Sequence, residues 1–471
     1  MKDFVKYTLA TLCGLFLAGI ALFILGILSI AGMMTMESAA PSIKPQSVLR
    51  LTLNGELQED APNDPLGDLF GSTYPTLSLR EIQTAIQGAK ENPNIDGIYI
   101  EAQTLLGATP AMIRDIRESL ADFKKSGKYI IAYGDNYTQG AYYICSIADS
   151  IILNPQGQVN WCGMASQPIF YKDLLEKIGI KMQVFKVGSY KSAVEPFTAT
   201  QMSDANREQV TSYLNDIWQT MLTDVSRSRS IKKDLLNEYA DSMLTFRPAE
   251  ELVRNGMVDS LCYIDGVSRM LRAKTGKDKG TLPLVSVKEL AAATEATPKK
   301  GDKIAVYYAY GDIVDRKTEW SENVIDAETV CRDLRTLRED ESVKAVVLRV
   351  NSGGGSAYAS EQIWHEVKLL REANPVVVSM GGMAASGGYY ISCAANYIVA
   401  EPTTLTGSIG IFGLIPDASQ LLSDKLGLHF DVVKTNAHAD FGTLARPFNP
   451  SEAQMMQGYI QRGYKLFTER V

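Results

Sequence analysis

Ser386 and Lys191 are the two side chains in this sequence that could act together as a nucleophile and a base. Ser386 stands in a run of small residues, Ala384-Ala385-Ser386-Gly387-Gly388. A serine hydroxyl attacks a carbonyl group effectively only when a neighbour takes its proton and donors stabilise the oxyanion that forms. Burial would lower the pKa of Lys191 and favour its neutral, basic form, whereas Glu195 would keep the amine charged if it pointed inward. We therefore predict Ser386 as the nucleophile and Lys191 as its general base.

This pairing rests on an internal duplication. The matching segments are residues 142–152 with 389–399, and residues 179–186 with 427–434. The first copy has Gln139 where the second has Ser386, and the second copy has no lysine where the first has Lys191. Because each half keeps the reactive side chain that the other lacks, we expect one active site assembled from both halves.

Glycines near Ser386 could stabilise the oxyanion. Gly387 begins a predicted helix, so its N–H would point toward the developing negative charge. A second N–H could come from Gly354 or Gly355, in a glycine run that follows a predicted strand at residues 345–351. A phosphate-binding loop is disfavoured, because the run matches neither G-x-x-x-x-G-K-[ST] nor G-x-G-x-x-G. A plain turn remains an alternative for the glycines considered alone.

Each reactive residue also has a simpler interpretation. A lysine is more often a solvated surface residue, and a serine beside glycines is more often part of a turn. The rival base is His438, which with Asp440 would give a Ser-His-Asp arrangement, although residues 436–440 have the polar composition of an exposed loop. The complementary retention across the two halves is what favours Ser386 with Lys191.

The elements that must position these residues alternate between strand and helix. Strands are predicted at residues 48–53, 97–101, 129–133, 304–311, 345–351 and 375–379, and helices at residues 111–125 and 360–372. The first strand is expected to end at Asn54-Gly55. The alternation predicts an α/β fold. We expect two repeats, residues 47–273 with Lys191 and residues 303–471 with Ser386, joined by a polar linker at residues 274–302.

The second repeat looks shorter than the first. Residues 459–471 align with residues 213–225, so the continuation of the first repeat through residues 240–259 has no counterpart. The break falls inside an amphipathic helical pattern. We therefore expect the second repeat to be truncated at its C-terminus.

The N-terminal segment is typical of a membrane anchor. Residues 7–36 contain no charged side chain and can cross the roughly 30 Å hydrocarbon layer as a helix. Lys2 and Lys6 precede this stretch, so the positive-inside rule places the N-terminus in the cytoplasm and the rest of the chain across the membrane. A cleaved signal peptide is the alternative, but the apolar run exceeds the usual ~7–15 residues. We expect residues 1–46 to be an uncleaved anchor and linker.

Composition excludes several classes of function. The chain has 471 residues and a net charge of −7, so a general basic field for nucleic acid is absent. Its six cysteines show no CxxC or other ligand spacing, so neither a disulfide framework nor a metal site is indicated. We expect no metal or cofactor.

Three motifs make the sequence resemble signal peptide peptidase A, in its long, duplicated Gram-negative form, which is related in fold to the ClpP and crotonase families. The motifs occupy residues 190–197, 384–389 and 405–410. The resemblance runs from the anchor to the last residue and implies that Ser386 is the nucleophile, Lys191 the base and Ser408 a residue that orients the lysine. The family often has Ser-Pro-Gly-Gly where this chain has Ser352-Gly353-Gly354-Gly355, and losing the proline loosens that loop.

The resemblance also implies two tandem ClpP/crotonase-like repeats behind a single transmembrane helix. It implies a homotetramer on the outer face of the inner membrane, with catalytic domains on the periplasmic side, that degrades cleaved signal peptides and other apolar peptides. Three other interpretations stay open. They are a serine hydrolase with Ser386 and His438, a crotonase-like acyl-CoA enzyme and an inactive membrane scaffold.

Overall fold

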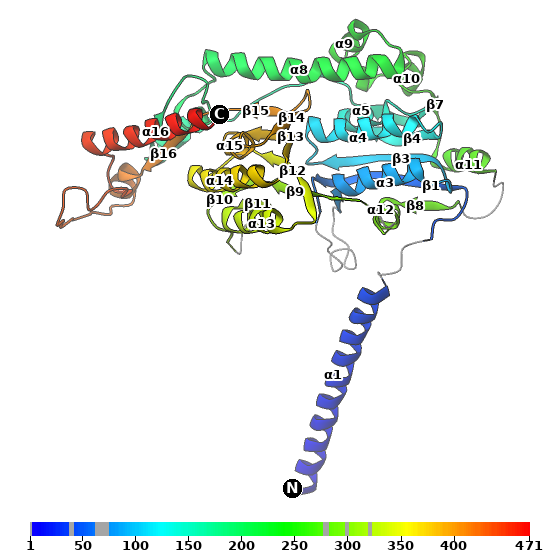
Figure 1. Cartoon of the computed structure of the whole chain (residues 1–471), viewed down its shortest axis with the longest axis horizontal. Coiled ribbons are helices and arrows are strands. Elements are labelled where there is room, and N and C mark those ends of the chain that lie inside the picture. The colour runs from blue at the N-terminus through cyan, green and yellow to red at the C-terminus, as the bar shows by residue number, and fades with distance from the viewer. Residues whose placement is uncertain (1, 37–41, 62–74, 277–281, 297–300, 319–322) are drawn as a thin grey trace.

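The computed structural model describes residues 2–36, 42–61, 75–276, 282–296, 301–318 and 323–471. Helix α1 (Lys2–Met36) is separate from the folded part of the chain (Figure 1). Its stretch Lys6–Gly26 is long and apolar enough to cross a membrane, and none of it is buried in the protein. One N-terminal apolar helix is therefore present, as a membrane anchor requires.

The first half of the chain folds around a parallel sheet with the strand order β2-β1-β3-β4-β5-β7, in which β8 also pairs with β1. Its strands are β1 (Ser47–Gln58), β2 (Thr76–Ser78), β3 (Ile95–Leu106), β4 (Tyr129–Tyr137), β5 (Ser150–Val159), β7 (Ser260–Leu261) and β8 (Leu284–Ser286). Its helices are α3 (Leu79–Glu91), α4 (Pro110–Lys124), α5 (Gln139–Cys145), α9 (Lys233–Asp241), η1 (Leu244–Phe246), α10 (Ala249–Arg254), α11 (Ile264–Thr275) and α12 (Val287–Glu295). Leu49, Leu51 and Leu53 of β1 pack into one core with α3, α4 and α5, and Val48 packs with α11 into another. Burial of both faces is typical of a parallel sheet.

Strand β1 is longer than the sequence predicts. It continues through Asn54-Gly55, where we expected it to end. Gly55 has a φ of 125°, and a Cβ atom there would lie 1.9 Å from the Pro75 carbonyl oxygen. The glycine therefore permits a close approach of backbone and a register shift within the strand, where the Asn-Gly pair suggested a turn.

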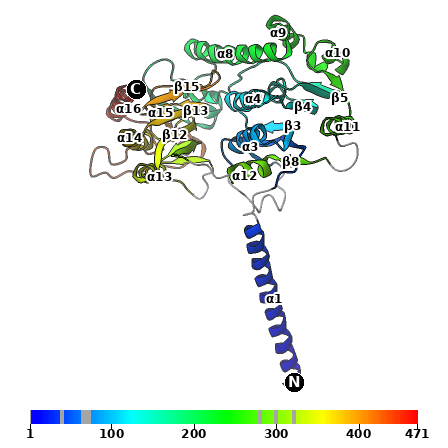
Figure 2. The ribbon, with the colours of Figure 1, turned by 45° about the vertical axis from the view of Figure 1, so that its right-hand side comes forward.

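The second half folds around a smaller parallel sheet with the order β14-β13-β12-β9, and β15 pairs with β13. Strands β12, β13 and β15 of this sheet are labelled in Figure 2. The strands are β9 (Lys303–Tyr310), β12 (Val343–Ser352), β13 (Val376–Ala385), β14 (Tyr397–Val399) and β15 (Leu405–Gly407), beside the small pair β10 (Asp312–Val314) and β11 (Val324–Asp326). The helices are α13 (Ala327–Glu339), α14 (Ala357–Ala373), α15 (Gly387–Ser392), η2 (Leu421–Lys425) and α16 (Pro450–Arg470). Buried residues of β12 and β13 form one core with α13, α14 and α15. The α/β class with two parallel sheets is confirmed.

The predicted linker at residues 274–302 is wrong in its middle. Residues 277–281 and 297–300 lie outside the described residues, but β8 and α12 between them belong to the first sheet. Val285, Leu290 and Ala291 are buried in the first core, and Ser286 with Glu289 forms a capping box that starts α12. The prediction rested on the polar residues at both ends of this segment and overlooked the amphipathic residues between them.

One strand of the first half leaves its own sheet and pairs with the second half. Strand β6 (Lys181–Lys186) lies antiparallel to β16 (Phe412–Asp417), with Phe185 opposite Gly413. Phe185 is buried and stacks on Phe448 at 5.8 Å between ring centroids. The chain reaches β6 through α6 (Lys172–Ile178) and continues into α7 (Glu195–Thr198) and α8 (Asp204–Arg229). This excursion carries Lys191 toward the second sheet.

A buried ion network fixes the two halves against each other. The guanidinium of Arg349, on β12, donates to Glu59 Oε2 at 2.9 Å and to Asp115 Oδ2 at 2.7 Å. Asn351 Nδ2 also donates to Glu59 Oε1, at 2.9 Å. Above both sheets runs α8, whose C-terminal half packs into the first core (Figure 1). These contacts hold the end of β12, and the glycine run after it, in register with the first half.

Candidate active site

Lys191 and Ser386 meet although 195 residues separate them in the sequence. Lys191 Nζ donates to Ser386 Oγ at 3.0 Å. The same nitrogen donates to the carbonyl oxygen of Ser408 at 2.8 Å and to its hydroxyl at 3.0 Å. Lys191 is 7% exposed, so these contacts lie in a site from which most water is excluded. The structure thus brings together the three residues that the sequence singled out.

Ser386 is presented by a strained connection between β13 and α15. Its φ is 53° and its ψ −117°, a conformation that residues other than glycine rarely adopt. The glycines after it allow α15 to pack closely: a Cβ on Gly387 would lie 2.6 Å from Ser360 Oγ, and one on Gly388 would lie 2.5 Å from the Ser352 carbonyl oxygen. The small-residue motif therefore has a steric cause, since larger residues would push the serine away from the end of β12.

The candidate oxyanion donors lie beside Ser386. Gly387 is the first residue of α15, where an α-helix leaves N–H groups without helical partners. Gly354 touches it, because a Cβ on Gly354 would lie 2.5 Å from Gly387 N. The N–H of Gly354 already donates to Ser352 Oγ at 3.1 Å. Ile313 pairs with the loop through two backbone hydrogen bonds: its N–H donates to the Gly354 carbonyl, and its carbonyl accepts from the Ser356 N–H. The N–H of Gly355 takes no part in this pairing. Because the N–H of Gly354 already has an acceptor, Gly355 is left as the candidate for the second donor.

Burial makes Lys191 a plausible base at mild pH. Desolvation lowers the pKa of the Lys191 amine to about 8. No carboxylate in the described part of the chain forms an ion pair with it. Glu195 could have kept the Lys191 amine protonated, but its carboxylate instead accepts hydrogen bonds from Ser203 and Asn206. Burial favours the neutral form of this carboxyl group, but the hydrogen bonds outweigh burial and lower its pKa.

Two strand pairings bring Ser408 to the amine. Strand β15 pairs with β13 directly next to the serine, so that Ala385 lies opposite Gly407, and Ser386 N donates to the Gly407 carbonyl oxygen at 2.9 Å. Ser408 follows with a φ of 49°. On the other side, the ladder between β6 and β16 ends at Lys186, five residues before Lys191. One half of the site is thus fixed by the second sheet and the other by the excursion of the first.

His438 does not take part in this site. It lies on the surface with Nδ1 3.4 Å from Glu452 Oε1. Asp440, its expected partner, forms ion pairs with Lys434 and Arg446. The Ser-His-Asp alternative is therefore wrong for this structure. Among the described residues, no group of three His, Cys, Asp or Glu side chains is placed to hold a metal ion.

A cavity of about 640 Å³ opens beside the site. Its lining comes from β13, β15, the glycine run, the Lys191 segment and α8: Tyr190, Ser192, Ala193, Asn206, Glu208, Gln209, Val210, Ser212, Tyr213, Asp216, Gly353, Met383, Ala385, Leu405, Thr406 and Ser408. The α8 wall was missed by the sequence analysis, because no local pattern in a helix shows which distant residues it faces. The position of the cavity next to Ser386 suits a substrate side chain.

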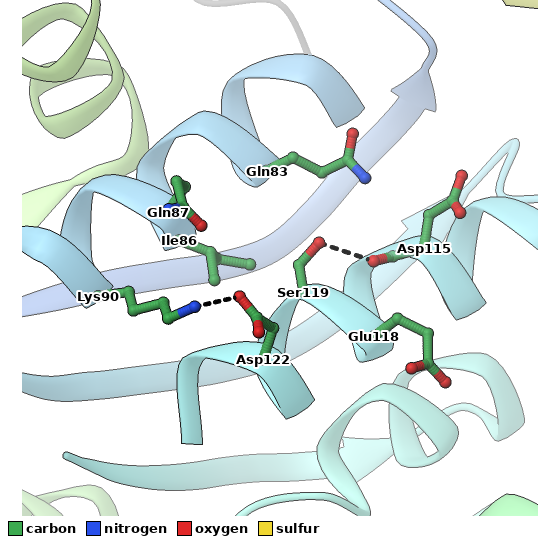
Figure 3. A pocket seen from close by; sticks show the side chains of 8 residues that line it. All are labelled: Gln83, Ile86, Gln87, Lys90, Asp115, Glu118, Ser119 and Asp122. Carbon is green, nitrogen blue, oxygen red and sulfur yellow. Dashed lines mark hydrogen bonds and ion pairs between the residues drawn. The ribbon is translucent and has the colours of Figure 1, made fainter. Parts of the chain in front are cut away.

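A second cavity, of about 270 Å³, lies elsewhere, between α3 and α4 (Figure 3). Lys90 and Asp122 form an ion pair across it at 2.6 Å. Its serine, Ser119, donates to the Asp115 backbone carbonyl (Figure 3). It therefore offers no activated nucleophile.

Comparison with known proteins agrees with this geometry. The model of peptidase family S49 matches residues 122–277 and 368–471, and the Clp protease model matches residues 312–404. Protease 4 of Salmonella typhi is 40% identical over 90% of this chain and 70% of its own length. Protease 4 of Haemophilus influenzae is 34% identical over 95% of this chain and 75% of its own length. The chloroplastic serine protease SPPA of Arabidopsis thaliana is 32% identical over 91% of this chain and 62% of its own length. The chain therefore belongs to peptidase family S49 and is a serine protease.

Proposed function

We propose that the protein cleaves peptide bonds through a Ser386–Lys191 dyad. The observation that carries the proposal is the 3.0 Å hydrogen bond between Lys191 Nζ and Ser386 Oγ, at a lysine without an ion-pair partner in the described chain. The neutral amine takes the hydroxyl proton as Oγ attacks the scissile carbonyl carbon. The resulting oxyanion accepts hydrogen bonds from the N–H groups of Gly387 and Gly355.

Lys191 then serves as the acid. Its ammonium gives the proton to the leaving amine, the peptide bond breaks, and the acyl group stays on Ser386. A water molecule attacks the acyl carbon while Lys191 takes the water's proton, and Ser386 leaves with that proton as the acid product departs. Ser408 holds Nζ in line throughout, because its carbonyl and hydroxyl both accept from the amine.

The proposed substrates are cleaved signal peptides and other apolar peptides at the membrane. The apolar helix Lys6–Gly26 supports this, because it would keep the site close to peptides that remain in the bilayer. Lys2 and Lys6 before the helix support a cytoplasmic N-terminus and a catalytic part on the periplasmic side of the inner membrane. The resemblance to signal peptide peptidase A supports the same substrate class.

A serine-directed fluorophosphonate probe and a fluorogenic peptide test the dyad on the full-length protein in detergent. We expect wild type to be labelled and active, Ser386→Ala to lose both properties, and Lys191→Ala to lose turnover while keeping its fold by circular dichroism. Ser342→Ala, at an exposed serine outside the site, is the control and should behave as wild type. Normal turnover in folded Lys191→Ala would assign the base elsewhere, and unlabelled wild type would favour an inactive scaffold.

We propose further that copies of the chain assemble into a homotetramer, and the duplication supports a route. Within one chain, β6 pairs with β16. The second-half counterpart of β6 is residues 429–434, and the first-half counterpart of β16 is residues 164–169. Both counterparts are exposed, and neither forms a strand in the single chain. Pairing residues 429–434 of one copy with residues 164–169 of the next repeats the internal contact. Such head-to-tail contacts form a closed ring when the rotation from one copy to the next closes.

A further inference from the structure

The lining of the cavity beside Ser386 has an apolar part and an acidic part. Met383, Ala385 and Leu405 contribute apolar side chains from β13 and β15, while α8 contributes Glu208 and Asp216. The apolar part therefore comes from the strands on either side of the connection that carries Ser386. A side chain bound in the cavity can contact both hydrocarbon and carboxylate groups.

The charge of the lining is one-sided. Among the described residues that line the cavity there are two carboxylates and no lysine or arginine. Asp216 also borders a neighbouring cavity that contains Arg114 and Arg227, which offsets part of its charge. Glu208 is therefore the main negative group facing the cavity.

Glu208 is held in place by the residue before the base. Tyr190 Oη donates to Glu208 Oε2 at 2.8 Å, and Tyr190 is adjacent in sequence to Lys191. Because a carboxylate has about four acceptor positions, this bond leaves room for a cationic donor from a substrate. The carboxylate is thus tied to the segment that carries the catalytic amine.

We infer that this cavity binds the side chain of a lysine or arginine on the acyl side of the cleaved bond, the P1 residue, with its alkyl chain against Met383 and Leu405 and its cationic end at Glu208. Lysine and arginine suit such a site, because their stems bury on apolar surface while the charged end reaches a polar group. The inference rests on the proposed function. It assigns a preference to cut next to basic residues, which in signal peptides precede the apolar core.

The test compares fluorogenic peptides that differ only at P1, with lysine or with norleucine, the uncharged equivalent of its stem. We expect full-length wild type to have a higher kcat/KM for lysine, and the preference to shrink as ionic strength rises. Glu208→Gln should lower the lysine-to-norleucine ratio about fivefold. Glu208→Lys should reverse the order of P1 lysine and P1 glutamate. Glu238→Gln, at an exposed glutamate on α9, should leave the ratio unchanged.

Each outcome separates this inference from the dyad itself. An unchanged, salt-independent ratio in variants that still react with fluorophosphonate would overturn the P1 assignment and leave the dyad standing. If wild type does not react with the probe, the proposed function fails. Glu208→Asp, which keeps the charge, should retain part of the lysine preference, whereas loss of the preference in that variant and in Glu208→Gln alike would point to a steric effect and against the assignment.

Discussion

At the scale of single residues, the informative feature is a buried lysine, Lys191, that has no counter-ion among the residues the structure describes. A carboxylate beside Lys191 would stabilise the ammonium, whereas burial alone destabilises it. Glu195 lies only four residues after Lys191 in the sequence. Its carboxylate instead accepts hydrogen bonds from Ser203 and Asn206 at the start of α8. The local geometry thus separates a structural carboxylate from the proposed catalytic amine within one short segment.

The pKa of Lys191 predicts how activity depends on pH. With a value of about 8, the amine is mainly protonated at pH 7 and mainly neutral at pH 9. Since the base must be neutral to accept the serine proton, kcat/KM should rise about tenfold per pH unit below 8 and level off above it. The measurement is a pH–rate profile with an uncharged P1 norleucine peptide. A profile that stays flat from pH 6 to 9 would contradict the assignment of Lys191.

At the scale of elements, the ladder between β6 and β16 decides whether the site forms. It joins a strand of the first half to one of the second, and Phe185 is its buried anchor against Phe448. Neither half can place both reactive groups by itself. The position of the amine therefore depends on packing some distance from the chemistry.

Truncating that anchor should disable the site without unfolding the sheets. We expect Phe185→Ala to lose about 3 kcal/mol of local packing, because a buried aromatic side chain is removed. The Lys191 segment should then detach from the Ser386 side. Turnover and the rate of fluorophosphonate labelling should fall together, while far-UV circular dichroism stays the same. Phe246→Ala, at a side chain that is 73% exposed, is the matched control. Wild-type turnover in Phe185→Ala would show that the ladder does not position the base.

Local patterns predicted the repeated strands and helices because the spacing of apolar residues within each segment indicates its secondary structure. They did not predict β8 and α12, whose apolar residues lie between charged ends, or the pairing of β6 with β16. A strand's partner depends on the whole chain, and both halves offer equivalent partners. For the site, the residues themselves identified Ser386 and Lys191 as candidates, and the family resemblance added Ser408. The sequence could not choose between Gly354 and Gly355, because that choice depends on the hydrogen bond from Gly354 to Ser352.

At the scale of the whole molecule, the unpaired counterparts of the internal ladder predict how copies meet. The register of β6 with β16 places Leu414 opposite Val184. The equivalent contact between two copies would bring Ser166 of one opposite Val432 of the other. Both positions are exposed in the single chain, so the contact needs no rearrangement of a core.

Engineered cysteines test this contact. In a background with Cys13 and Cys162, the two exposed cysteines, changed to serine, we expect Ser166→Cys with Val432→Cys to form disulfides between chains. Non-reducing electrophoresis should show a ladder of covalent species that reaches the tetramer. Each single cysteine variant is a control and should give no ladder. If the double variant stays monomeric on the gel while light scattering shows a tetramer, the assembly uses another surface.

The division of the proposed dyad between the two halves also has a consequence during synthesis. The ribosome makes the amine well before the hydroxyl, since 195 residues separate them. A half-synthesised chain therefore contains Lys191 without Ser386 and cannot cleave other proteins through this site. If the proposed dyad is the active site, activity requires completion of the second half and its docking on the first, so the split itself delays activity until the chain has folded.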